Sequence, residues 1–152
     1  MALREQFTTA LKVSMKAGEQ RRVSTVRMIL AALKERDIDA RGKGNPNGIE
    51  DAEIQRMLQG LVKQRREAIE LYKQGNRPEL VQQEQEEIAI IETFLPKQMS
   101  DAEAEGAIKQ IIAAVGAASV KDMGKVMAAL KEKYSGQLDL SKAGGIVKKL
   151  LG

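Results

Sequence analysis

The most concentrated group of side chains that could perform chemistry is the set of carboxylates between residues 78 and 95. Five glutamates fall there without a lysine or arginine among them: Glu79, Glu84, Glu86, Glu87 and Glu92. Paired carboxylates can act as general acid and base or bind a hard cation. These five are spread along one helical segment with no aspartate cluster beside them, so we interpret them as partners for the basic faces of the preceding helices.

The other residue types that commonly carry catalysis are missing. The chain has no cysteine and no histidine, which removes thiolate chemistry, the commonest general base and the commonest nitrogen ligand for metals. The glycine-rich loop at 41–48 follows a helical segment and lacks the GxxxxGK[ST] pattern of a phosphate-binding loop. The sequence therefore argues against independent enzymatic activity, and we assign no catalytic residue, metal or cofactor; carboxylates, lysines and Ser/Thr remain as chemical groups.

Lysine is the remaining chemical signal, and it is concentrated near the carboxyl end. From residue 116 onward there are three acidic residues and seven lysines, namely Lys121, Lys125, Lys131, Lys133, Lys142, Lys148 and Lys149. Ammonium groups can neutralise phosphates without reading bases. Interleaved aromatic residues are lacking, which argues against stacking on single-stranded bases. The arginines of residues 20–40 could also meet phosphate, but charged residues around a helix are usually a solvated face.

The stretch 119–136, SVKDMGKVMAALKEKYSG, is the clearest element among these lysines. Ser119 and Asp122 have the spacing of a capping box, and Gly136 can end the helix in a left-handed conformation. An apolar stripe is predicted from Met123, Val126, Met127, Leu130 and Tyr134. Gly124 interrupts this helix at a cost of about 1 kcal/mol. With Ala128 one turn on, it indicates close approach of either another helix or a partner.

Composition places the whole chain among all-α proteins. It has 152 residues, 43% hydrophobic residues, 3% aromatic residues and a net charge of +4. Helix-forming residues predominate, and the charge permits nucleic acid without requiring it. The start, MALREQF, does not resemble a signal peptide, and no apolar run approaches the roughly 20 residues of a membrane span. We expect a cytoplasmic protein with no membrane partner.

Helical periodicity divides the chain into two parts. We predict four helices before Pro96, over 2–17, 20–40, 50–74 and 78–95, and three after it. The apolar faces expected in the first part include Leu3, Phe7, Leu11 and Met15. Pro96 and the Ser100/Glu103 capping box mark a boundary, giving domains 1–97 and 98–152. The last helix is expected to bury Ile146, Val147, Leu150 and Leu151, and its glycines 144–145 indicate close packing.

These segments resemble the YqeY family. KDMGKVMAALKEKYSG with IVKKLL resembles that family's tail, which is similar to the tail of GatB, the tRNA-recognising subunit of aspartyl/glutamyl-tRNA amidotransferase. The earlier segments STVRMILAALKE, LVKQRREAIELY, NRPELV and FLPKQMS resemble YqeY proteins in order along nearly the whole chain. The resemblance implies an amino-terminal domain of long helices and a carboxy-terminal three-helix tail.

The same resemblance implies a contact with tRNA. It would involve Lys121, Gly124, Lys125, Met127 and Gly136. Family members commonly carry a basic residue after this last glycine, where the chain has Gln137 and so lacks one expected phosphate contact. Kinship with GatB also links the family to carbon–nitrogen ligase activity with glutamine as amido-N-donor, although the matching catalytic domain is absent.

Three functions follow as hypotheses. The first is a non-catalytic RNA-binding accessory module, for tRNA, that works beside an amidotransferase or an aminoacyl-tRNA synthetase. The second is a protein-interaction adaptor that docks through Gly124 and Ala128. The third is the ligase activity implied by kinship. The expected RNA-contact residues are Lys121, Gly124, Lys125, Met127, Lys131, Lys133, Gly136, Lys142, Lys148 and Lys149.

Overall fold

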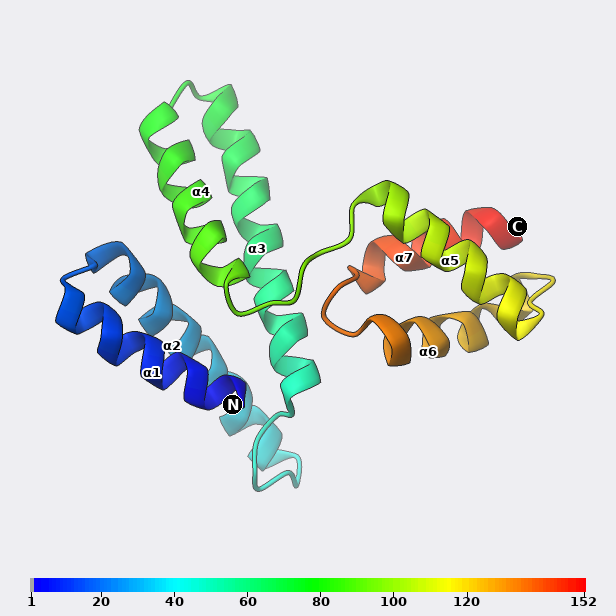
Figure 1. Ribbon diagram of the computed structural model, residues 1–152, viewed down its shortest axis with the longest axis horizontal. Helices are drawn as coiled ribbons and strands as arrows, with labels where there is room; N and C mark the ends of the chain where they lie inside the picture. Colours follow the sequence, from blue (N-terminus) through cyan, green and yellow to red (C-terminus); the bar gives the residue numbers. More distant parts are fainter. Residues whose placement is uncertain (1) are drawn as a thin grey trace. The chain divides into compact units, whose positions relative to one another are not determined.

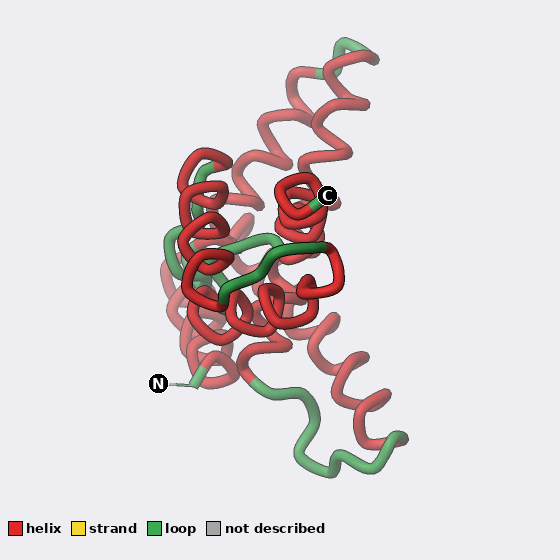
Figure 2. The backbone as a smooth tube through the Cα atoms, turned by 90° about the vertical axis from the view of Figure 1, so that its right-hand side faces the viewer, coloured by secondary structure: helices red, strands yellow, loops and turns green. Residues whose placement is uncertain are grey.

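The computed structural model describes residues 2–152, which form two compact units that divide between Leu95 and Pro96. The described residues contain seven α-helices and no strand, so the predicted all-α class is confirmed. Figure 2 shows only helices and the loops that join them. Each unit has its own cluster of buried apolar side chains.

The amino-terminal unit consists of two antiparallel helical hairpins. The first hairpin pairs α1 (Leu3–Ala17) with α2 (Gln20–Gly42), and the second pairs α3 (Asp51–Gln74) with α4 (Pro78–Glu92) (Figure 1). Contacts between α2 and α4 join the hairpins. Helix α4 ends three residues before the predicted Leu95. The chain turns there and buries Phe94 against the core.

The core of this unit contains residues from all four helices and from the turn after α4. The ring of Phe7 meets the ring of Phe94 edge-on, with centroids 4.9 Å apart and planes at 82°, a favourable aromatic geometry. The buried residues of this core are Leu3, Phe7, Val26, Ile29, Leu33, Ile54, Met57, Leu58, Val62, Ile91 and Phe94.

The predicted apolar face of α1 is wrong at its last position. Met15 is 53% exposed, whereas the neighbouring Ser14 is fully buried. The Ser14 hydroxyl donates to the Ala10 carbonyl at 2.6 Å, so its polar atom is satisfied within the helix. The chain reverses directly afterwards at Gly18, which has φ 71°. A small side chain therefore occupies the buried position next to this short turn.

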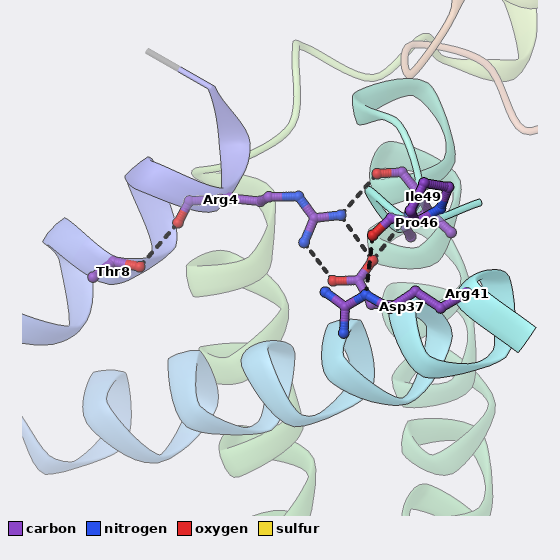
Figure 3. A network of polar contacts seen from close by, with 6 residues as sticks. All are labelled: Arg4, Thr8, Asp37, Arg41, Pro46 and Ile49. Carbon is purple, nitrogen blue, oxygen red and sulfur yellow. Dashed lines mark hydrogen bonds and ion pairs between the residues drawn. The ribbon is translucent and has the colours of Figure 1, made fainter.

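A buried aspartate holds the loop between α2 and α3 in place (Figure 3). Asp37 accepts two hydrogen bonds from the Arg4 guanidinium and one from the Ile49 backbone N–H at 2.9 Å. Arg4 also donates to the Ile49 carbonyl at 2.8 Å. These contacts, led by the Arg4 hydrogen bonds, hold the pKa of Asp37 below its usual value. Gly48 lies against this carboxylate with φ 79°.

The acidic side chains of α4 pair with arginines of α2 and α3, as the sequence led us to expect. Arg65 is half-buried and lies 3.0 Å from Glu87 and 3.9 Å from Glu84. Burial, followed by the negative charge of Glu87, raises the pKa of Glu84. The more exposed pairs are Arg21–Glu86 and Arg66–Glu92. The glutamates of α4 therefore serve largely in charge pairing.

The carboxy-terminal unit is a three-helix bundle. It contains α5 (Asp101–Val115), the 3₁₀ turn η1 (Val120–Asp122), α6 (Met123–Tyr134) and α7 (Leu140–Leu151). The Ser100/Glu103 capping box that starts α5 is confirmed: Ser100 Oγ accepts from the Glu103 N–H, and the Glu103 carboxylate accepts from the Ser100 N–H. The buried apolar residues of the three-helix bundle are Ala104, Ile108, Ile111, Val126, Leu130, Leu138, Ala143 and Val147.

The predicted inner face of α7 is correct except at Leu150. Val147 is fully buried, and Ile146 and Leu151 pack partly against the core. Leu150 is 39% exposed. At about 100° per residue, position 150 lies some 60° from position 147 around the helix axis, toward the rim of the buried face.

Candidate nucleic-acid interface

The lysine-rich stretch begins with a 3₁₀ turn, where the sequence predicted the first turn of an α-helix. The Asp122 carboxylate accepts hydrogen bonds from the backbone N–H groups of Ala118 and Ser119, at 2.9 Å and 3.4 Å. These bonds lower the pKa of Asp122. Helix α6 starts one residue later. Asp122 therefore satisfies two free backbone donors ahead of α6.

All seven lysines of this region are exposed. None of them forms an ion pair with a carboxylate of the described chain, where the nine ion pairs involve other residues. Lys133 Nζ lies 5.5 Å from the centre of the Tyr134 ring, a cation–π contact that leaves its ammonium group at the surface. These charges are therefore open to an external anion.

Helical geometry separates the lysines of α6 and α7 from the core. Val126 and Leu130 are fully buried, and Lys125 lies about 100–140° from them around the axis of α6. On α7, Lys142 and Lys149 lie on the side away from Ala143 and Val147. The bundle thus presents lysines on both helices, and α6 and α7 contact each other directly.

Gly124 is exposed, and a methyl group built on it would meet no atom within 4 Å. Close packing inside the chain therefore does not account for this glycine, and that alternative is wrong. The glycines of α7 behave similarly, because Gly145 faces open space and Gly144 has only an ordinary 3.7 Å contact with Met123. Of the two alternatives weighed for Gly124, contact with a partner remains.

Two of the expected contact residues also have structural roles. Met127 packs partly against the core of the bundle. Gly136 is buried, has φ 78°, and its carbonyl accepts a hydrogen bond from the Gln98 side chain. The neighbouring Gln137 carbonyl accepts from the Met99 N–H at 2.9 Å. Residues 136–137 thus anchor the segment that leads into α5, a role that helical periodicity does not reveal.

The described residues offer no alternative site of metal chemistry. Across residues 2–152, no group of three or more aspartate, glutamate, histidine or cysteine side chains is placed to hold a metal ion. The same residues contain no helix whose length and apolarity would let it cross a membrane.

Comparison with known proteins identifies the family. The model of the Yqey-like protein family matches residues 4–151, nearly the entire chain. The chain belongs to the Yqey-like protein family. Among curated proteins, this YqeY-like chain is 34% identical over 95 residues to "Altered inheritance of mitochondria protein 41, mitochondrial" of Lachancea thermotolerans, covering 62% of the chain and 49% of that relative.

The protein of the same name from Eremothecium gossypii is 33% identical over 85 residues, which cover 56% of the chain and 44% of that relative. The YqeY-like chain thus spans about half the length of the curated relatives it matches. Both relatives are named as mitochondrial, so the expectation of a plainly cytoplasmic protein is wrong. That expectation came from a non-apolar first segment, which does not distinguish one aqueous compartment from another.

Proposed function

We propose that this YqeY-like protein is a non-catalytic RNA-binding accessory module whose carboxy-terminal bundle contacts the phosphates of a structured RNA, tRNA in particular. The observation that carries the proposal is the set of seven exposed lysines on η1, α6 and α7, without carboxylate partners in the described chain. A lysine without a carboxylate at ion-pair distance meets less competition when it binds phosphate.

The expected mode of contact is independent of base sequence. Tyr134 is the one aromatic residue of the bundle, and it packs partly against the core. Stacking on splayed bases therefore contributes little, and phosphate contacts position the RNA. The resemblance to the GatB tail supports tRNA as the RNA, with an amidotransferase or an aminoacyl-tRNA synthetase as a neighbouring protein. No residue of the chain is assigned a catalytic role in this proposal.

The test compares two triple variants of the full chain in binding to a tRNA transcript at several salt concentrations. The first is Lys121→Gln with Lys125→Gln and Lys131→Gln. The matched control removes three exposed lysines that also form no ion pair: Lys34→Gln, Lys63→Gln and Lys97→Gln. Each lost phosphate contact reduces the salt slope by about 0.7–0.9, so the first variant should bind on the order of 100-fold more weakly at 0.1 M salt.

Equal weakening by both triple variants would show that binding follows net charge alone and would refute the lysine surface of the bundle. Failure of the wild-type chain to bind tRNA at low salt would refute RNA binding altogether. A loss restricted to the first variant, similar for unrelated tRNAs, supports phosphate contact over base recognition.

A protein-interaction adaptor is the second candidate, and the open environment of Gly124 favours it. Gly124 is the second residue of α6, and not in mid-helix as predicted, so its cost to helix stability is smaller. The glycine relieves no contact in the chain, and a closely approaching partner would explain it. The experiment is affinity capture from nuclease-treated extract with wild-type and Gly124→Glu chains. A protein retained by the wild type alone supports an adaptor, whereas a partner lost on nuclease treatment supports RNA.

A further inference from the structure

A cleft lies at the turn between α1 and α2, in the amino-terminal unit. Its volume is about 720 Å³, within the range of ligand pockets in proteins. Its polar lining comes from α2 and its apolar lining from the last turn of α1 and the start of α2. The lining residues are Met15, Gly18, Gln20, Arg21, Val23, Ser24 and Arg27.

The segment that forms this cleft is rich in basic residues, although Glu84 and Glu86 of α4 lie near Arg21. Residues 12–27 contain two lysines, three arginines and one acidic residue. Arg27 is exposed and forms no ion pair with any residue the structure describes. Arg21 pairs with Glu86 at 3.3 Å, but the two side chains are 42% and 47% exposed. An exposed pair of this kind contributes little, so an incoming phosphate can replace Glu86 at Arg21.

The apolar wall of the cleft adds a second kind of contact. Met15 is 53% exposed and Val23 is half-buried. A thioether side chain adapts readily to a flat ligand surface. Two apolar side chains are too few to hold the hairpin on a membrane, because the main apolar face of α2 is buried in the core. Guanidinium groups beside a small apolar wall match a nucleotide better than a lipid surface.

We propose that this cleft accepts one nucleotide unit of the bound RNA, with its phosphate against Arg21 and Arg27 and its sugar or base against Met15. The inference rests on the proposed function and adds to it a second RNA contact, located in the amino-terminal unit. Arginine suits the role because its planar fork can donate two hydrogen bonds to one phosphate.

The affinity test uses the full chain with Arg21→Gln and Arg27→Gln. The matched control is Arg56→Gln with Arg66→Gln. Like the cleft pair, it removes one exposed arginine without an ion pair, Arg56, and one exposed arginine in an ion pair, Arg66, which lies 3.2 Å from Glu92. One lost phosphate contact should weaken binding to a tRNA transcript roughly five- to eightfold at 0.1 M salt and reduce the salt slope by about 0.7–0.9. The control should bind like the wild type.

A second measurement places the RNA at the cleft directly. In protein labelled with ¹³C at the methionine methyl groups, the Met15 resonance should move as tRNA is added, while that of Met57, which is 2% exposed, should stay in place. A Met15 resonance that does not move overturns the inference, even where the arginine variant binds weakly. The inference is also overturned if the Arg21→Gln and Arg27→Gln variant loses binding to vesicles of phosphatidylserine and phosphatidylcholine but not to tRNA.

The two proposals fail in different ways. If tRNA binding depends on Lys121, Lys125 and Lys131 but the cleft variant behaves like its control, the cleft inference is overturned and the proposed function stands. If the cleft variant is weakened, the Met15 resonance moves and the lysine variant binds like the wild type, the cleft is supported and the carboxy-terminal interface is refuted. If the wild-type chain binds no RNA, both are refuted.

Discussion

Replacing Asp37 by alanine should destabilise the amino-terminal unit far more than replacing one of its exposed neighbours along α2. Asp37 is 5% exposed and is the shared acceptor for Arg4 and for the Ile49 N–H. Its removal leaves the guanidinium without its carboxylate and the Ile49 N–H without its acceptor. Breaking a buried ion pair costs about 3–5 kcal/mol, and an orphaned donor about 1–3 kcal/mol.

The Arg4 side chain is 37% exposed, so water can solvate it once Asp37 is gone. This screening lowers the expected loss below the sum of those two costs, to about 2–3 kcal/mol. The matched control is Asp39→Ala, on the same helix. Asp39 pairs with Lys43 at 3.0 Å, but both side chains are about 70% exposed, so its loss should cost about 0.5 kcal/mol or less. The change in helix propensity is the same in both variants.

Native-state hydrogen exchange is the suitable assay because the two units have separate cores. The slowest amides of the amino-terminal unit should lose about 2–3 kcal/mol of protection in Asp37→Ala, while those of the carboxy-terminal unit are unchanged. A loss equal to that of Asp39→Ala would refute the reasoning. The effect should also depend on pH. The folded-state pKa of Asp37 is lowered, so its stabilisation is present above its ordinary value of 3.8 and disappears as pH falls through the lower, folded-state pKa.

Two glycine substitutions give further predictions. Gly48→Ala should destabilise the amino-terminal unit by at least about 1 kcal/mol more than Gly44→Ala, measured by urea unfolding; both have positive φ, but only at Gly48 would the new methyl group lie 2.2 Å from Asp37 Oδ1. Equal costs would contradict the contact. Gly124→Ala should instead stabilise the carboxy-terminal unit by less than the roughly 1 kcal/mol of a helix interior, since the methyl group enters open space in the first turn of α6. Destabilisation there would indicate a close neighbour.

Local signals in the sequence predicted the helices well. The capping box of Ser100 and Glu103 was found because its two members lie three residues apart and bond each other's backbone. Gly136 was expected to have a positive φ because it follows a helical stripe, and it does. The inner positions Val126 and Leu130 followed from the same periodicity. In each case, the information lies within one or two helical turns.

Contacts between distant segments were not predictable in this way. Asp37 looks like any other charge in a helix with many charges, and its burial depends on Arg4, 33 residues earlier. The exposure of Met15 depends on how closely α1 and α2 meet beside Gly18. The cleft lined by Arg21 and Arg27 likewise exists only once the hairpin has formed. The excess of lysine after residue 116, by contrast, is visible in the composition alone.

The contact between Phe7 and Phe94 has a consequence for synthesis of the chain. These two residues lie near opposite ends of the amino-terminal unit's sequence, although their rings touch in the fold. The core therefore cannot close until almost the whole unit has left the ribosome. During that interval, the apolar residues of α1 and α2 have been synthesised, but the residues of α3 and α4 that cover them have not. The carboxy-terminal unit is the shorter of the two, so its core can close within a narrower window of translation.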